Sequence, residues 1–459
     1  MPIQQIGNTG KQYYLVSFDE NGVERPEVDG TLLSETIRKR LADPSEKITD
    51  VFLASHGWKG DVPAAIEQND RWMGEMIASP DRAAMMKAHP EFKALNIGLH
   101  WPSLPFGDED IPSADAPKVL GAHSSLDTQV DQFAAVIADT PKARTAIRAI
   151  LEANRKDSGR NTELPDAVKT AYKSLFAEAK LGGKHDDIGA SPGEDHPALD
   201  AEKMYEATRQ SEEKKASKAT PGERDLTLGG GLFDKLKGLL VSPLQQASFW
   251  KMKKRARIVG EGGIHSLLDS LMRTAGDDVR FHLMGHSFGC IVVSAAVAGP
   301  PGKPGLKRGV DTLFLAQGAL SLWSFCPDIP FARGTPGYFR RILEKGLVRG
   351  PLVTTRSKFD KAVGKLYPPA ADLDDEVILA ADLPKYGGVG TFGAQGLGAG
   401  ATDGPMKAAD QPYAFKANGV YNLEASEIIK NGGGFSGAHS DIAHPEVAHA
   451  MWQAVAVTR

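Results

Sequence analysis

The strongest structural signal in this chain lies at residues 279–290, which read VRFHLMGHSFGC. A mostly apolar run at 279–284, typical of a buried strand, leads into the pattern G-x-S-x-G at 285–289. The apolar residues Ile291, Val292 and Val293 follow, as in a buried helix. The sequence therefore predicts a strand, a tight turn carrying Ser287, and a helix.

The residue types at this turn suit nucleophilic catalysis. A serine hydroxyl is a poor nucleophile at neutral pH, so it needs a histidine to take its proton and backbone N–H groups to hold the oxyanion. Gly285 and Gly289 let the neighbouring backbone approach closely enough for a nucleophile elbow to form. G-x-S-x-G can arise by chance in a chain with 49 glycines, and it is the flanking strand and helix that favour a catalytic Ser287.

Strands and helices alternate on both sides of this turn. This alternation predicts an α/β protein with a mostly parallel central sheet flanked by helices, in which an active site lies beyond the carboxyl ends of the strands. We expect further strands at 13–18, 23–25, 49–54, 94–100, 311–316, 352–355 and 420–423, and helices at 32–41, 64–77, 249–271 and 445–457.

The middle of the chain has a different character. It is polar from about residue 104, with helices expected at 129–153 and 166–181. Residues 182–229 are dense in charged residues, Gly and Pro, so this part is expected to bury little and to be partly mobile. We interpret 104–245 as a mainly helical insertion, a cap or lid, in a core formed by 1–103 and 246–459.

Residues 231–240, near the end of this insertion, are amphipathic. A transient contact with a membrane surface is one interpretation of such a segment. Packing against the protein itself is the favoured one.

The strand expected at 49–54 runs directly into Ser55-His56-Gly57-Trp58. A strand that ends in His-Gly before a loop can supply the second donor of an oxyanion hole. The backbone N–H groups of Trp58 and Phe288 are therefore our candidates for this hole. The alternative for His56 and Gly57 is an ordinary tight turn.

Ser287, Asp360 and His439 each follow an expected strand, in the order nucleophile, acid, base. Ser287 would attack the substrate, and His439 would act as general base and then general acid. Asp360 would hold the imidazole in its useful tautomer and stabilise its charge.

Other residues compete for two of these roles. Asp360 can also be read as a surface charge beside Lys358 and Lys361. The competing bases are His56, His286, His444 and His449, and the competing acids are Asp328, Asp372, Asp374 and Asp441.

These segments resemble the α/β-hydrolase superfamily, and within it a bacterial group of lipase-like and esterase-like serine hydrolases. The resemblance covers the core, about half of the chain, and is carried by residues 55–58, 100–103, 285–289, 354–364 and 437–441. Trp58 departs from the run of glycines that some lipases have at this position. The part of the insertion at 104–230 has no counterpart in this resemblance.

The resemblance implies an α/β-hydrolase fold and hydrolysis of a carboxylic ester through an acyl-serine intermediate. The substrate would be a lipid or another small acyl ester, and neither a metal ion nor an organic cofactor is expected. A serine peptidase or amidase with the same triad is the first alternative. A non-catalytic binding protein of the same fold is the second.

Composition argues against other classes. The formal charge of −4, from 54 basic and 58 acidic residues, gives no electrostatic case for nucleic-acid binding. We interpret the basic run at 251–255 as the solvated face of a helix. A metal-dependent hydrolase is disfavoured because H-E-x-x-H is absent and His185-Asp186-Asp187 lies in a polar segment.

The two cysteines, Cys290 and Cys326, cannot form a disulfide framework, which fits a reducing compartment. The first ten residues have neither a basic nor an apolar region of the kind that directs secretion, and no apolar run approaches the ~20 residues that span a bilayer. We therefore expect a cytoplasmic protein, or one exported without a cleavable signal peptide. The sequence specifies neither its oligomeric state nor the acyl chain it would accept.

Overall fold

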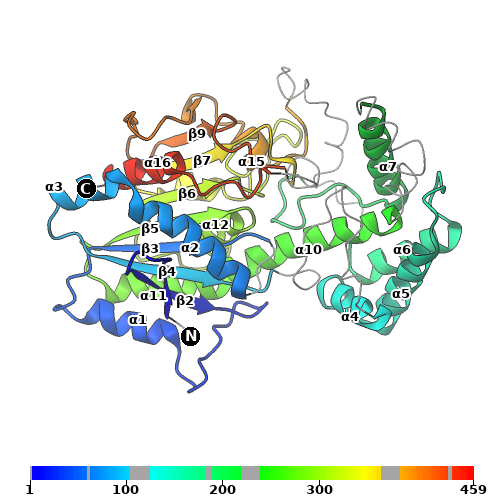
Figure 1. Ribbon diagram of the computed structural model, residues 1–459, viewed down its shortest axis with the longest axis horizontal. Coiled ribbons are helices and arrows are strands. Elements are labelled where there is room, and N and C mark those ends of the chain that lie inside the picture. Colours follow the sequence, from blue (N-terminus) through cyan, green and yellow to red (C-terminus); the bar gives the residue numbers. More distant parts are fainter. Residues whose placement is uncertain are drawn as a thin grey trace.

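Nine strands form one sheet in the computed structural model, which describes residues 3–58, 62–103, 125–181, 188–218, 238–362, 383–432 and 437–458 (Figure 1). The order across the sheet is β1-β2-β4-β3-β5-β6-β7-β9-β8. β1 pairs with β2 in the antiparallel sense, and every other pairing is parallel. The expected α/β class is thereby confirmed. The strands are β1 (Ile3–Gln5), β2 (Gln12–Ser17), β3 (Asp50–Ser55), β4 (Ala94–His100), β5 (Arg280–His286), β6 (Thr312–Ala316), β7 (Leu352–Arg356), β8 (Thr402–Pro405) and β9 (Val420–Glu424).

The central strands are buried on both faces. Every residue of β3 and of β6 is buried. Successive side chains of β3 point to opposite sides, so that Val51 and Leu53 join one apolar core while Phe52 and Ala54 join the other. Near-continuous apolar strands are what a parallel sheet covered on both faces requires.

Helices cover the two faces of the sheet and bury these two cores. One core includes residues of α1 (Leu33–Ala42), α11 (His265–Thr274) and α12 (Gly289–Ala298). The other includes residues of α2 (Val62–Ala78), α3 (Pro80–Ala88) and α16 (Pro445–Ala456). Short helices lie in the later loops: α13 (Arg340–Glu344), α15 (Val389–Phe392) and the 3-10 helix η6 (Gly398–Gly400).

The helix expected at 249–271 is longer in the structure and contains a π-helical turn. It consists of α10 (Ser242–Val259), the π-helix η3 (Gly260–Ile264) and α11. A Cβ at Gly260 would lie 2.5 Å from the Val292 carbonyl oxygen, and a Cβ at Gly263 would overlap Gly22. Glycine is therefore needed where this helix crosses α12 and the turn after β2.

Four further helices form a group beyond the end of the sheet, which α10 joins to the core (Figure 1). They are α4 (Leu126–Val136), α5 (Pro141–Lys156), α6 (Asp166–Glu178) and α7 (Ala201–Lys218). The single helix expected at 129–153 is divided, because Thr140 caps α5 by accepting a hydrogen bond from the Ala143 N–H at 3.1 Å.

Parts of the middle segment that we expected to bury little are ordered into this group. Met204 and Tyr205 on α7 are buried. Of the amphipathic segment 231–240, residues 231–237 lie outside the described part of the chain. The 3-10 helix η2 (Leu239–Val241) packs on the protein, with Leu240 buried and its carbonyl oxygen accepting a hydrogen bond from the Tyr172 hydroxyl at 2.6 Å.

Two local expectations were wrong. Residues 23–25 form no strand but only an isolated bridge between Glu24 and Phe18. The basic run at 251–255 is not simply a solvated face, because Lys253 is fully buried and pairs with the buried carboxylate of Asp195 at 2.5 Å.

Within the residues that the structure describes, no helix is both long enough and apolar enough to cross a bilayer.

Candidate active site

The candidate site residues lie at the carboxyl ends of neighbouring parallel strands. Gly57 and Trp58 follow β3, and Ser287 follows β5. Asp360 follows β7, and His439 lies in the loop between β9 and α16. In parallel sheets these strand ends meet along one edge, which brings together residues that are far apart in sequence.

The turn after β5 has the backbone geometry of an elbow. Ser287 has a φ of 57°, in the left-handed region that a residue with a side chain seldom adopts. A Cβ at Gly285 would lie 2.6 Å from the Cys290 nitrogen, and a Cβ at Gly289 would overlap the Ser55 carbonyl oxygen. Both glycines of G-x-S-x-G are therefore required sterically.

Ser287, His439 and Asp360 form a chain of hydrogen bonds. His439 Nε2 lies 2.7 Å from Ser287 Oγ, and His439 Nδ1 lies 2.9 Å from Asp360 Oδ2. All three residues are buried. Since the Asp360 carboxylate can only accept, Nδ1 carries the proton, and the lone pair of Nε2 faces the Ser287 hydroxyl.

Three contacts hold the loop that carries His439. The Ala438 N–H donates to the Phe359 carbonyl oxygen at 2.9 Å, and Gly437 forms a bridge with Asp360. His286 Nε2 donates to the His439 carbonyl oxygen at 2.9 Å. The His286 side chain, one of the competing bases, thus supports the backbone of His439.

Gln317, which sequence reasoning missed, is also part of this site. Its side-chain Nε2 lies 3.1 Å from Asp360 Oδ2, and the residue is fully buried. The available signal was its position: Gln317 directly follows β6, the strand beside β5, and a polar residue at that strand end is a candidate by the same rule that singled out Ser287.

The two backbone groups expected to form an oxyanion hole flank the nucleophile. A Cβ at Gly57 would lie only 2.6 Å from Ser287 Cβ, so the backbone before Trp58 touches the nucleophile. In the described part of the chain, neither the Trp58 nor the Phe288 backbone N–H donates a hydrogen bond to a protein acceptor. Both donors are therefore available to an oxyanion.

The His56 side chain supports this backbone through hydrogen bonds. Its Nδ1 donates to the Gly57 carbonyl oxygen at 2.8 Å, and its Nε2 accepts from His100 Nδ1 at 3.1 Å. The Trp101 indole N–H donates to the His56 carbonyl oxygen at 3.2 Å, and the two rings stack. His56 thus supports the backbone beside the site, and its ring is held by Gly57 and His100 rather than placed next to Ser287 Oγ.

The competing histidines and acids have other partners. His444 pairs with Asp441 at 2.8 Å, and His449 pairs with Asp81 at 2.7 Å. Asp328 accepts the Gly334 N–H at 2.7 Å in an exposed turn. The other two competing acids, Asp372 and Asp374, lie outside the described residues.

The thiol of Cys290 lies close to Ser287 but is not a second nucleophile. It is fully buried, and its Sγ–H donates to the Gly285 carbonyl oxygen at 3.2 Å. Burial, together with the charge of Asp360, raises the pKa of this thiol well above its usual range. The reactive thiolate form is therefore suppressed.

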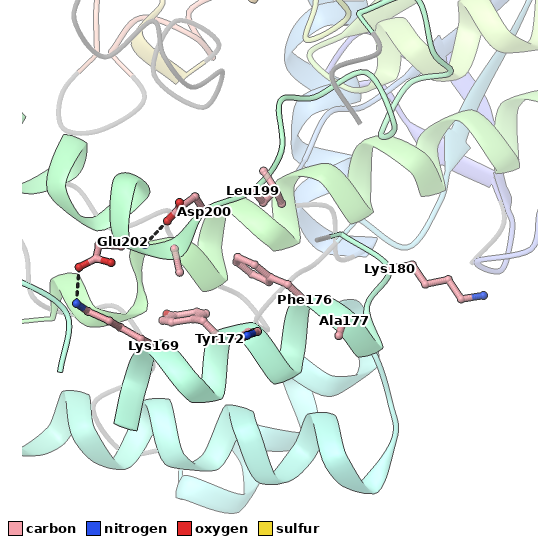
Figure 2. A pocket seen from close by; sticks show the side chains of 10 residues that line it. Lys169, Tyr172, Phe176, Ala177, Lys180, Leu199, Asp200 and Glu202 are labelled. Carbon is pink, nitrogen blue, oxygen red and sulfur yellow. Dashed lines mark hydrogen bonds and ion pairs between the residues drawn. The ribbon is translucent and has the colours of Figure 1, made fainter. Parts of the chain in front are cut away.

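A separate cavity of about 580 Å³ opens between α6 and the segment 199–202 at the start of α7 (Figure 2). Tyr172, Phe176 and Leu199 give it an apolar wall, and Lys169 at its edge is paired with Glu202. None of the predicted site residues lines this cavity.

Within the described residues, no group of three or more His, Cys, Asp or Glu side chains is placed to hold a metal ion; His185, Asp186 and Asp187 lie outside those residues. Comparisons with protein-family models, with curated proteins and with solved structures find no match.

Proposed function

We propose that this protein is a serine hydrolase that cleaves carboxylic esters through an acyl-serine intermediate. The observation that carries the proposal is the buried chain of hydrogen bonds from Ser287 Oγ through His439 to Asp360. Such a chain combines a nucleophile, a general base and a group that orients the base.

In the first half of the proposed reaction, Ser287 Oγ attacks the ester carbonyl while its proton passes to His439 Nε2. Asp360 keeps Nδ1 protonated and stabilises the imidazolium that forms. The N–H groups of Trp58 and Phe288 hold the oxyanion. His439 then gives its proton to the leaving alcohol, which completes the acyl-serine.

In the second half, a water molecule attacks the acyl-serine. His439 Nε2 takes a proton from this water and returns it to Ser287 Oγ as the acid leaves. The free enzyme is regenerated without a metal ion or an organic cofactor.

The arrangement of the chain supports membership of the α/β-hydrolase superfamily as part of this proposal. The nucleophile, acid and base follow β5, β7 and β9 in the order typical of that fold. The helices α4, α5, α6 and α7, which lie between β4 and β5 in the chain, would then form a cap, in line with the interpretation of 104–245 as an insertion.

An apolar acyl group is favoured by the surroundings of the oxyanion donors. The Trp58 ring lies 5.7 Å from the Phe288 ring and 6.0 Å from the ring of Phe249, which belongs to α10. Apolar side chains thus surround the proposed oxyanion donors, and on this ground we infer that the substrate is a lipid or another acyl ester. Amides remain the comparison class, because the same triad can cleave them.

A fluorophosphonate probe tests the nucleophile directly, since it phosphonylates an activated serine. We expect the wild-type protein to be labelled and Ser287→Ala to be unlabelled. Ser294→Ala is the matched control, because Ser294 is a buried serine on α12 in the helix that follows Ser287, and it should be labelled like the wild type. Labelling of Ser287→Ala, or no labelling of a folded wild-type protein, would overturn the proposal.

The acyl group is then defined by turnover. We expect p-nitrophenyl esters of graded chain length to be hydrolysed and the matching anilides to react far more slowly. Faster cleavage of the anilides would assign the triad to an amidase instead.

A further inference from the structure

Gln317 is a buried amide whose orientation is fixed by its partners. Its Nε2 lies 3.1 Å from Asp360 Oδ2 and 3.2 Å from the Gly390 carbonyl oxygen, and both of these atoms only accept. Its Oε1 accepts a hydrogen bond from the Thr355 hydroxyl at 2.9 Å. The donor end of the amide is therefore directed at the carboxylate.

The backbone at Gln317 is held in a disfavoured conformation. Its φ of 46° lies in the left-handed region, although the residue is not glycine. The Gln317 N–H donates to the Thr355 hydroxyl oxygen at 3.0 Å, which stabilises this turn. A strained residue in a fully buried polar network indicates a constraint beyond folding.

The same turn also holds the backbone of the nucleophile. The Ser287 N–H donates to the Ala316 carbonyl oxygen at 3.2 Å, and the Ala319 N–H donates to the Ser287 carbonyl oxygen at 3.1 Å. The segment after β6 thus contacts the nucleophile through its backbone and the acid through the Gln317 side chain.

Asp360 Oδ2 consequently accepts hydrogen bonds from His439 Nδ1 and from Gln317 Nε2. A Cβ at Gly390 would lie 2.7 Å from the same oxygen, so the carboxylate is enclosed on that side as well. These two hydrogen bonds to one oxygen restrict rotation of the carboxylate.

We propose that Gln317 is a positioning residue for the serine hydrolase reaction, and that its amide holds the Asp360 carboxylate in the orientation that aligns the His439 imidazole. This inference rests on the proposed function. Gln317 reaches the reacting atoms only through Asp360 and His439, so its loss should lower kcat and leave KM nearly unchanged.

The first test removes the donor and keeps the length of the side chain. We expect Gln317→Met to lower kcat for a p-nitrophenyl ester about 10- to 100-fold, with KM within about twofold of the wild-type value. Gln395→Met is the matched control, because the Gln395 amide donates to the Phe392 carbonyl oxygen and not to the triad. Its kcat should stay close to that of the wild type.

The second test places a titratable group at the same position. In Gln317→Glu the new carboxyl can donate to Asp360 while it is protonated, but two carboxylates at this distance resist being ionised together. Activity should be partly retained at low pH and should fall as pH rises and the new carboxyl loses its proton. A merely structural role would lower kcat by the same factor at every pH.

The pH profile has to be compared with that of the wild type, because other titratable groups face the network. They are His286 from β5, whose ring lies 4.9 Å from the His439 ring, Cys290 from α12, and Lys361 next to Asp360 along the chain. They are common to both proteins, so a descending limb found only in Gln317→Glu belongs to the new carboxyl.

These outcomes separate the two proposals. If the wild type is labelled by the fluorophosphonate but Gln317→Met keeps the wild-type kcat, Gln317 has no positioning role and the hydrolase assignment stands. A Gln317→Glu profile parallel to that of the wild type likewise excludes a positioning role, and it is the deciding measurement if Gln317→Met does not fold by circular dichroism. Absence of labelling in the wild type removes the proposed function itself.

Discussion

At the scale of single residues, a methyl group added at Gly57 should harm the site. A Cβ there would lie 2.6 Å from Ser287 Cβ, so Gly57→Ala must displace either the nucleophile or the backbone that carries the Trp58 N–H. We expect kcat to fall at least about 10-fold, because small displacements of catalytic groups are costly. Steady-state ester hydrolysis measures this loss.

Gly74→Ala is the control for this substitution. Gly74 lies within α2 and has no atom within 4 Å of the position of a Cβ. Alanine is favoured over glycine in a helix by about 1 kcal/mol, so this variant should keep full activity with equal or greater thermal stability. If both variants behave alike, the close approach of Gly57 to Ser287 is not important.

The base and the acid can be tested in the same assay. His439→Ala and Asp360→Asn should each lower kcat by about 10³- to 10⁴-fold, because the first removes the base and the second favours the wrong tautomer of the imidazole. His444→Ala is the control, since His444 pairs with Asp441. Loss of activity in His444→Ala, with His439→Ala active, would transfer the role of base to His444.

At the scale of secondary structure elements, α10 connects the helical group to the site. Phe249 on this helix is buried, with its ring 5.0 Å from the ring of Phe288 and 6.0 Å from that of Trp58. The side chains of Trp58 and Phe288, whose backbone N–H groups are the proposed oxyanion donors, thus pack against α10. We expect Phe249→Leu to lower kcat severalfold.

Phe339→Leu is the matched control for Phe249→Leu. Phe339 is also a fully buried phenylalanine, but it packs against Phe325 and Tyr338. Each variant should lose about 1 kcal/mol in free energy of unfolding. Only Phe249→Leu should also lose activity at temperatures where both are folded, as thermal melts and initial rates together would reveal. An equal effect on kcat would argue against coupling through α10.

Lys253 on the same helix forms a buried ion pair with Asp195, which precedes α7 in the chain. Replacing Lys253 alone leaves an uncompensated carboxylate in the interior, which costs about 3–5 kcal/mol. Lys253→Met should therefore unfold at much lower denaturant concentration, and the double variant Lys253→Met/Asp195→Asn should recover most of the loss. Chemical denaturation measures both, and a double variant no more stable than the single one would contradict this account.

At the scale of the whole molecule, a buried carboxylate at the amino-terminal ends of the central strands makes the free energy of unfolding depend on pH. Asp50 on β3 is fully buried and lies 3.0 Å from His282 Nε2 and 3.2 Å from Arg280 Nε on β5. Burial alone would raise the pKa of Asp50, but its hydrogen bonds to His282 and Arg280, together with the charge of His282, lower it to about 2. The carboxylate therefore links two central strands.

A lowered pKa means that this stabilisation is fully present above the ordinary carboxyl pKa and is lost as pH falls through the folded-state value. We expect the free energy of unfolding to decrease by about 2 kcal/mol on account of Asp50 between about pH 4 and pH 2. Asp50→Asn should be less stable at neutral pH and should lose less on acidification. Denaturation curves at several pH values measure this difference, and parallel curves for the two proteins would contradict it.

The strands were largely predictable because burial on both faces leaves a local record. β4 occupies 94–100 as expected, and β3 differs by one residue at each end, since both are runs of apolar residues with few alternatives. β1 and β8 were missed because both lie at the edges of the sheet, where short strands with exposed residues carry no apolar signal. Similarly, nothing local shows that Lys253, one of several basic residues in a run, would be the buried one.

The sequence by itself determined the α/β class and the turn at Ser287, because a strand, an elbow and a helix are local patterns set by neighbouring residues. It also favoured His439 and Asp360 as base and acid because each follows an expected strand, while leaving their rivals open. Only the tertiary structure decided that His439 and Asp360, rather than their rivals, lie within hydrogen-bonding distance of one another and of Ser287, and that Gln317 joins them. The physical reason is that these contacts span 43 to 152 residues of chain, and the register of the parallel strands, not any local pattern, sets which loops meet at one edge of the sheet.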